Sequence, residues 1–240
     1  MSHHDHPWRQ AFRLSLSAAK ENLLPCLGGQ TIIAIFVFAY FFYPPTVTLL
    51  EALAHFRSAG GLAASFVMTG FAGGLLAEVL RVYTLQKGKW KRKNVSDALF
   101  LFVVIGIGGM GADRLYAIQN ALFGTEPDPL TILKKVILDQ FFYAPLIIAP
   151  YMAAVFEWRD AGFSFSKLWQ QRKGIYARRV IPFLITNWSF WIPMTILIYS
   201  MPTLLQIPIL VFITAIWGSV LLSLDHLTRQ KLHATVEIRG

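Results

Sequence analysis

The sequence predicts an all-α, polytopic helical membrane protein with about six transmembrane helices. Apolar residues make up 55% of the 240 residues and charged residues only 15%, which is more apolar material than one soluble core of this size buries beneath a charged surface. The apolar residues also form continuous blocks instead of alternating at every second position. Blocks of roughly 20 residues cross the hydrocarbon layer as helices, so a helical bundle is expected rather than a barrel.

Six apolar blocks are expected to span the membrane, and in chain order they are Leu24 to Tyr43, Leu62 to Tyr83, Ala98 to Leu122, Val136 to Phe156, Val180 to Tyr199 and Leu204 to Leu224. They divide the chain into an N-terminal part, 1–61, which holds an amphipathic segment, the first span and a loop; a helix bundle, 62–225; and a tail, 226–240. Only a few residues around Pro202 join the last two blocks, so a re-entrant hairpin is an alternative to two full spans there.

The net charge of +9 comes from Lys and Arg residues whose positions indicate the orientation of the spans in the membrane. If six spans start from a cytoplasmic N-terminus, 18 Lys and Arg residues fall on the inner side and only 3 on the outer side. This bias follows the positive-inside rule, so both termini are expected on the cytoplasmic side, or on its equivalent in an organelle. Membrane lipids are expected partners because anionic headgroups attract the basic side, whereas a nucleic-acid partner is not expected.

The chain offers little for catalysis or for binding a metal. Cys26 is its only cysteine, which excludes an internal disulfide and a thiolate metal cluster. The histidines lack the Glu-x-x-His or His-Glu-x-x-His spacing of a di-iron or zinc site. Since no nucleophile can be matched with a base, we expect neither enzymatic activity nor a metal or cofactor.

Ionisable residues inside the apolar blocks are the first candidates for a functional site, because each costs roughly 2.5 to 3.5 kcal/mol in hydrocarbon. The fourth span opens with Lys135, Asp139 and Gln140, and the third span is interrupted by Asp113 and Arg114. These two regions lie on the same outer side in the expected topology, so we expect them to meet as one charged cluster at the mouth of a polar path. For the pair in the third span, locking helices together is an equal alternative.

A second acidic candidate, Glu78, lies near the inner end of the second span. Arg81 follows three residues later, so the two side chains are expected to share one helix face. A pair that snorkels to the inner interface is the alternative to a transport site here.

Small residues and prolines predict how the helices pack. The pair Gly70 and Gly74 in the second span and Gly108 in the third, four residues before Ala112, give flat faces on which helices pack closely, with or without a pore. Pro145 lies inside the fourth span and is expected to kink it, because proline removes a backbone hydrogen bond.

The run from Lys134 to Pro145, with Asp139 and Gln140 inside it, resembles the signature of the family named for the twenty-two-kilodalton peroxisomal membrane protein and its mitochondrial relative, Mpv-seventeen. The segment 73–78 is similar to that family's Gly-Asp-x-x-Ala-Gln element. Trp188 and Trp191 are similar to its C-terminal tryptophan-rich block. The resemblance covers roughly residues 62–225.

The resemblance implies an integral membrane protein that is channel-like or related to solute transport, weakly selective, and able to pass a small polar or anionic solute. It assigns this role to Lys135, Asp139, Gln140 and Pro145, and self-association into a homo-oligomer is a further expectation. Members of the family lie in mitochondrial inner and peroxisomal membranes. Departures such as Gly74 in place of Asp suggest a distant member, which we expect in a bacterial inner membrane. A non-conducting membrane scaffold or a lipid-interacting protein is the alternative function.

Overall fold

The computed structural model describes residues 26–171 and 174–219. These residues form helices and, within those ranges, no β-strand, which confirms the all-α fold class. Four helical segments are long and apolar enough to cross a membrane: Pro44–Thr84, Arg92–Phe123, Pro129–Asp160 and Ile181–Tyr199. These helices fit an integral membrane protein. The expected amphipathic N-terminal segment and the tail, 226–240, lie outside the described residues.

The first and last expected spans, Leu24 to Tyr43 and Leu204 to Leu224, fall only partly within the described residues. Within the described residues they are the apolar helices Cys26–Phe42 and Thr203–Ser219, each 17 residues long. The described residues thus contain four apolar helices of membrane-spanning length, and the count of six spans stays a prediction.

The prediction of a loop from Pro44 to Gly61 is wrong, because this segment forms the first part of helix α2, Pro44–Gly70. Prolines occupy its first turn, where the missing N–H costs no helical hydrogen bond, and no strong helix breaker follows until Gly60 and Gly61. At Gly61 the backbone adopts φ 54° and ψ −136°, a conformation that favours glycine, and the helix divides there into two stretches. The second stretch begins where the second span was expected.

The chain divides into two compact units that are discontinuous in sequence. In the described residues, unit 1 comprises 26–30, 118–171 and 174–202, and unit 2 comprises 31–117 and 203–219. Helix α4, Arg92–Phe123, contributes residues to both.

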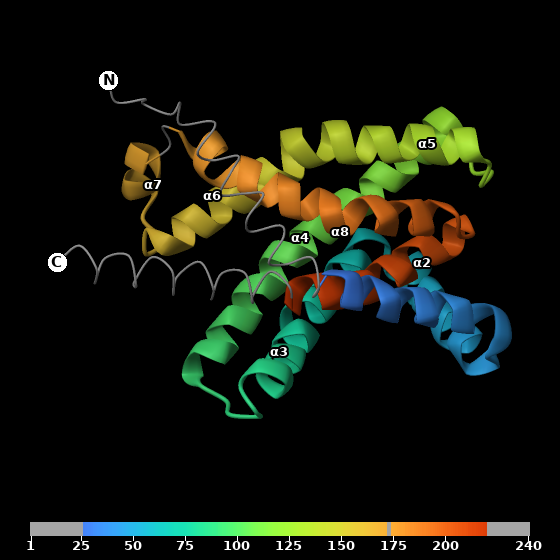
Figure 1. The fold of residues 1–240 in the computed structure, drawn as a ribbon, viewed down its shortest axis with the longest axis horizontal. Coiled ribbons are helices and arrows are strands. Elements are labelled where there is room, and N and C mark those ends of the chain that lie inside the picture. The colour runs from blue at the N-terminus through green and yellow to red at the C-terminus, as the bar shows by residue number, and fades with distance from the viewer. Residues whose placement is uncertain (1–25, 172–173, 220–240) are drawn as a thin grey trace, which may run out of the picture. The chain divides into compact units, whose positions relative to one another are not determined.

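In unit 2, α2 continues without interruption into η1, Phe71–Leu76, and α3, Ala77–Leu85. A short connection then reverses the chain into α4, so α3 and the first part of α4 lie side by side (Figure 1). Helix Thr203–Ser219 packs on the same unit, where Ser219 donates a hydrogen bond of 3.2 Å to the Ala77 carbonyl.

In unit 1, α5 (Pro129–Ile137), η2 (Leu138–Ile148) and α6 (Ala149–Asp160) form one continuous rod, and α8, Ile181–Tyr199, runs along it (Figure 1). The short helices α7, Phe165–Gln171, and η3, Tyr176–Val180, lie between α6 and α8 in the chain. Small side chains allow the close approach of α8 to the rod, and the buried cluster there consists of Ala144, Ala149, Ala153, Val180 and Leu184.

Asp128 caps the N-terminus of α5. Its carboxylate accepts hydrogen bonds from the backbone N–H groups of Leu130 (3.0 Å) and Thr131 (3.1 Å), and Pro129 occupies the first position of the helix. Hydrogen bonds from Thr131, and then from Leu130, lower the pKa of Asp128 below its usual value.

We expect Asp128→Ala to lower the apparent melting temperature in detergent at neutral pH by a small amount, on the order of 2 °C. Because the folded pKa is depressed, the contribution of the cap is present above the unfolded pKa of Asp, about 3.9, and is lost as the pH falls through the folded value. The melting temperatures of the native chain and Asp128→Asn, compared between pH 7 and pH 3, check this. Asn keeps a capping acceptor at every pH, so the loss of stability on acidification should be smaller in the variant.

Candidate functional site

Asp139 lies at the start of η2 and is buried against α8. Its carboxylate accepts hydrogen bonds from the Tyr199 hydroxyl (2.6 Å) and from Gln140 Nε2 (3.1 Å). Gln140 Oε1 in turn accepts a bond of 3.5 Å from Asn187 Nδ2. The four side chains form a buried polar group within two apolar segments, and we call it the Asp139 group.

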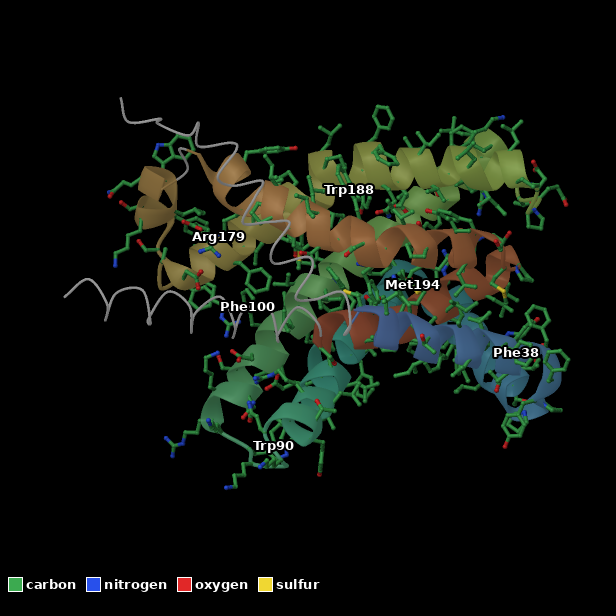
Figure 2. All side chains as sticks on the ribbon, in the orientation of Figure 1. Phe38, Trp90, Phe100, Arg179, Trp188 and Met194 are labelled. Carbon is green, nitrogen blue, oxygen red and sulfur yellow. The ribbon has the colours of Figure 1, made fainter. Side chains whose placement is uncertain are left out.

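Helix α8 is fixed against this group by Trp188. The indole N–H of Trp188, which is labelled in Figure 2, donates a hydrogen bond of 2.7 Å to the backbone carbonyl of Gln140 in η2. The ring of Trp188 also packs on Phe141, with centroids 5.5 Å apart. Trp191, one turn later, packs edge-on against the neighbouring buried Phe190. Of the two tryptophans singled out from the sequence, Trp188 thus joins α8 to the rod, whereas the contact of Trp191 with Phe190 lies within α8.

Lys135 lies one helical turn before Asp139 and is only 2% exposed. Its ammonium donates a hydrogen bond of 2.6 Å to Asn120 Oδ1 near the end of α4, and lies 5.9 Å from the centre of the Tyr199 ring. Gln119 is fully buried beside it and donates from Nε2 to the Lys135 carbonyl (3.1 Å). Gln119 Oε1 has no hydrogen-bond partner among the described residues.

Lys135 and Asp139 therefore do not pair with each other, although they are four residues apart in the sequence. The Lys135 ammonium is bonded to Asn120, and the Asp139 carboxylate is bonded to Tyr199 and Gln140. The backbone changes from α-helical to π-helical winding between them, at Leu138. Pro145 lies inside the same π-helical segment, and its carbonyl accepts a hydrogen bond of 3.3 Å from Tyr176. The kink expected at this proline takes the form of a widened helix.

The charged residues expected from the third span belong to a different unit. Asp113 is buried and bonded to Arg57 and Ser65, both from α2. Arg57 is the residue that sequence reasoning missed as a partner, because it was assigned to a loop. Arg114 is exposed on the surface of the unit. The structure thus gives Asp113 and Asp139 separate sets of partners, where one shared cluster was expected.

Glu78 and Arg81 share one helix face, as their spacing predicts. Both are buried, and Arg81 binds the Glu78 carboxylate through Nε at 2.9 Å and through its terminal nitrogen. Asn94 of α4 donates to the same carboxylate, and Asp97 accepts a bond of 2.7 Å from Lys93 Nζ and lies 3.9 Å from Arg81. Asn94 and Asp97 were missed in the sequence, although their spacing of three along a helix was a visible signal.

The glycines differ in what they contact. A Cβ atom at Gly70 or Gly74 would meet the backbone of Phe102 on α4, so these glycines permit the close packing expected of them. Gly108 has nothing within 4 Å of its Cβ position, and the packing expected there is instead made by Gly106 and Gly109, which lie against α2.

Arg179 ties η3 to the end of α6. It forms ion pairs with Glu157 and, at 2.6 Å, with Asp160, and Figure 2 labels it beside α6. Glu157 is buried while Asp160 is exposed. This pairing fixes the end of the rod at a distance from the Asp139 group along the chain, so we interpret it as structural.

Comparison of the chain with protein-family models, with curated proteins and with solved structures found no match. The assignment of a function therefore depends on the residues and contacts described above.

Proposed function

We propose that this chain is a multi-pass membrane protein that passes a small polar or anionic solute with weak selectivity and without catalytic turnover. The path runs by the Asp139 group and Lys135. The resemblance to the twenty-two-kilodalton peroxisomal membrane protein family rests on the same residues and is part of the proposal.

One observation carries it: Lys135 and Asp139 are buried in one apolar helix, carry opposite formal charges, and are hydrogen-bonded only to neutral groups in the described chain. Burying two charges separately is more costly than burying them as a direct pair, and apolar residues would pack the helices at lower cost still. Such an arrangement is expected where the charges serve a solute. Gln119 Oε1, an unused acceptor beside Lys135, adds a further polar contact for it.

A non-conducting scaffold is the second candidate, and the contacts of unit 2 favour it. The Arg57–Asp113 and Glu78–Arg81 pairs satisfy their charges within the protein, and glycines bring the helices into close contact. The Arg57–Asp113 pair joins α2 to α4, Asn94 of α4 bonds the Glu78 carboxylate of α3, and the glycines allow close helix contacts, which is what a scaffold requires.

The distinguishing experiment reconstitutes the purified full-length chain in planar bilayers and in vesicles loaded with anionic and cationic solutes. We expect the native chain to conduct, Lys135→Gln to lower anion passage relative to cation passage, and Asp139→Asn to raise it, because each removes one sign of charge from the path. Changes of several-fold in the permeability ratio are expected. Asp113→Asn is the matched control, since that carboxylate is paired with Arg57 in unit 2, and it should leave the ratio unchanged.

Two outcomes reject the proposal. If the native chain passes neither current nor solute over a range of voltage and pH, the scaffold function replaces it. If the native chain conducts but Lys135→Gln and Asp139→Asn keep its permeability ratio, the path does not include these residues.

The topology is proposed on the charge distribution of the sequence. Cys26–Phe42 and Thr203–Ser219 serve as the first and last of six spans, and both termini lie on the cytoplasmic side of a bacterial inner membrane. The stretch of α2 before Gly61 then adds no crossing. Labelling of single cysteines placed at residues 2 and 240 tests this, since accessibility from opposite faces contradicts an even number of crossings.

A further inference from the structure

The connection between α3 and α4 carries a dense set of exposed cations. Between Glu78 and Asp97 the chain has a net of four positive charges. Five neighbouring side chains at the tip are exposed, and we call them the hairpin patch: Lys87, Lys89, Trp90, Lys91 and Arg92. Figure 2 labels Trp90 at this tip, where it is 49% exposed.

The two acidic residues of the hairpin are turned inward, away from the patch. Glu78 is fully buried and bonded to Arg81 and Asn94, and Asp97 is 3% exposed and bonded to Lys93. In the described chain, no acidic side chain forms an ion pair with the cations of the patch. Its charge is therefore available to an external partner.

The buried contacts also hold the tip in one conformation. Asn94 accepts a hydrogen bond of 2.6 Å from the Lys91 backbone N–H, and Gly88 with a φ of 76° donates a bond of 3.0 Å to the Val82 carbonyl. These contacts close the turn between the two helices. The cations consequently lie on and beside a turn that is closed by hydrogen bonds from backbone N–H groups.

The position of the hairpin identifies its partner. The patch joins two apolar segments that are long enough to cross a membrane, Pro44–Thr84 and Arg92–Phe123, so it lies where a bilayer surface meets them. Tryptophan is favoured at the level of the headgroups, and lysine and arginine near a bilayer surface are attracted by anionic lipids.

We propose that the hairpin patch binds the phosphate headgroups of anionic phospholipids in the membrane that holds the protein. The cations contact the phosphates and Trp90 lies among the headgroups. This interaction is independent of solute passage, because it involves unit 2 and neither Lys135 nor Asp139.

The test reconstitutes the full-length chain in phosphatidylcholine membranes and measures, by electron paramagnetic resonance, its preference for spin-labelled phosphatidylglycerol over spin-labelled phosphatidylcholine. We expect a clear preference at low ionic strength that falls as salt is added. The triple variant Lys87→Gln, Lys89→Gln, Lys91→Gln should lose most of it, because each cation near an anionic surface strengthens the attraction about fivefold. The charge-keeping triple variant with arginine at the same positions should retain it.

A matched control removes charge elsewhere: Lys134→Gln with Lys167→Gln changes two exposed lysines on α5 and α7 and should keep the preference. An unchanged preference in the glutamine triple variant overturns the proposal, as does an equal loss in the control. If the native chain shows no headgroup preference but retains a labelled single-stranded oligonucleotide through the same three lysines, the patch binds nucleic acid and the proposal fails. Melting curves that match the native chain establish that each variant is folded.

Discussion

Replacing Arg81 by methionine is expected to destabilise the protein by about 3 to 5 kcal/mol. The loss arises because Glu78, fully buried, would keep its carboxylate without the guanidinium that binds it through two nitrogens. Methionine keeps an unbranched apolar stem like that of arginine, lacks the guanidinium and adds no charge. Unfolding of the purified chain in mixed micelles by increasing denaturing detergent measures the change in free energy.

The double variant Glu78→Gln with Arg81→Met is the control. With the carboxylate gone, no buried charge is left unpaired, and much of the stability lost in Arg81→Met should return. Asn94 can still bond the amide that replaces the carboxylate. If the single variant is as stable as the native chain, or if the double variant is the less stable of the two, Arg81 does not stabilise the buried Glu78 carboxylate as described.

Replacing Gly74 by alanine is expected to cost about 1 to 3 kcal/mol, because the added methyl group overpacks a helix contact. The new Cβ would lie against the backbone of Phe102 and the carbonyl of Ala98, and backbone cannot move aside as a flexible side chain can. Gly108→Ala is the matched control. It makes the same change in a helix of the same unit, at a position where the added Cβ has no neighbouring atom within 4 Å. It should be neutral or stabilising by up to about 1 kcal/mol, since alanine has the higher helix propensity.

The same unfolding measurement compares the stability of Gly74→Ala with that of Gly108→Ala. Equal stability of Gly74→Ala and Gly108→Ala would contradict the contact between η1 and α4. Loss of stability in Gly108→Ala alone would show that the other face of α4 makes the closer contact.

The sequence predicts those features of this fold that are local. Continuous apolar blocks indicate long helices whatever their neighbours, so the four membrane-length helices coincide with four of the six expected spans, although the first of them begins at Pro44 and not at Leu62. The spacing of Glu78 and Arg81 places them on one helix face without knowledge of the rest of the fold. Both inferences use only the geometry of a single helix.

Contacts between distant segments were not predictable in the same way. The partner of Asp139 is Tyr199, 60 residues later, and the partner of Asp113 is Arg57, 56 residues earlier. Both Tyr199 and Arg57 are common residue types in unremarkable positions, so nothing marks them as partners. Lys135 and Asp139 also have separate partners, Asn120 and Tyr199, although a spacing of four places them on one helix face.

The glycines show a related limit. A pattern of two small residues four apart marks a helix face but not whether another helix lies against it. Gly70 and Gly74 meet α4, whereas Gly108 meets nothing and its neighbours Gly106 and Gly109 make the contact. Which face is covered depends on the rotation of α4 about its axis, and that rotation is set by the whole bundle.

The break at Gly61 gives Asp113 a mechanical role. Arg57 precedes the break and Ser65 follows it, and both are bonded to the one carboxylate on α4. Asp113 on α4 thus stabilises the angle between the two stretches of α2. Glycine alone would permit other backbone conformations at position 61. A movement of α4 that displaces Asp113 would therefore also displace Arg57, and the stretch that begins at Pro44 would rotate about Gly61.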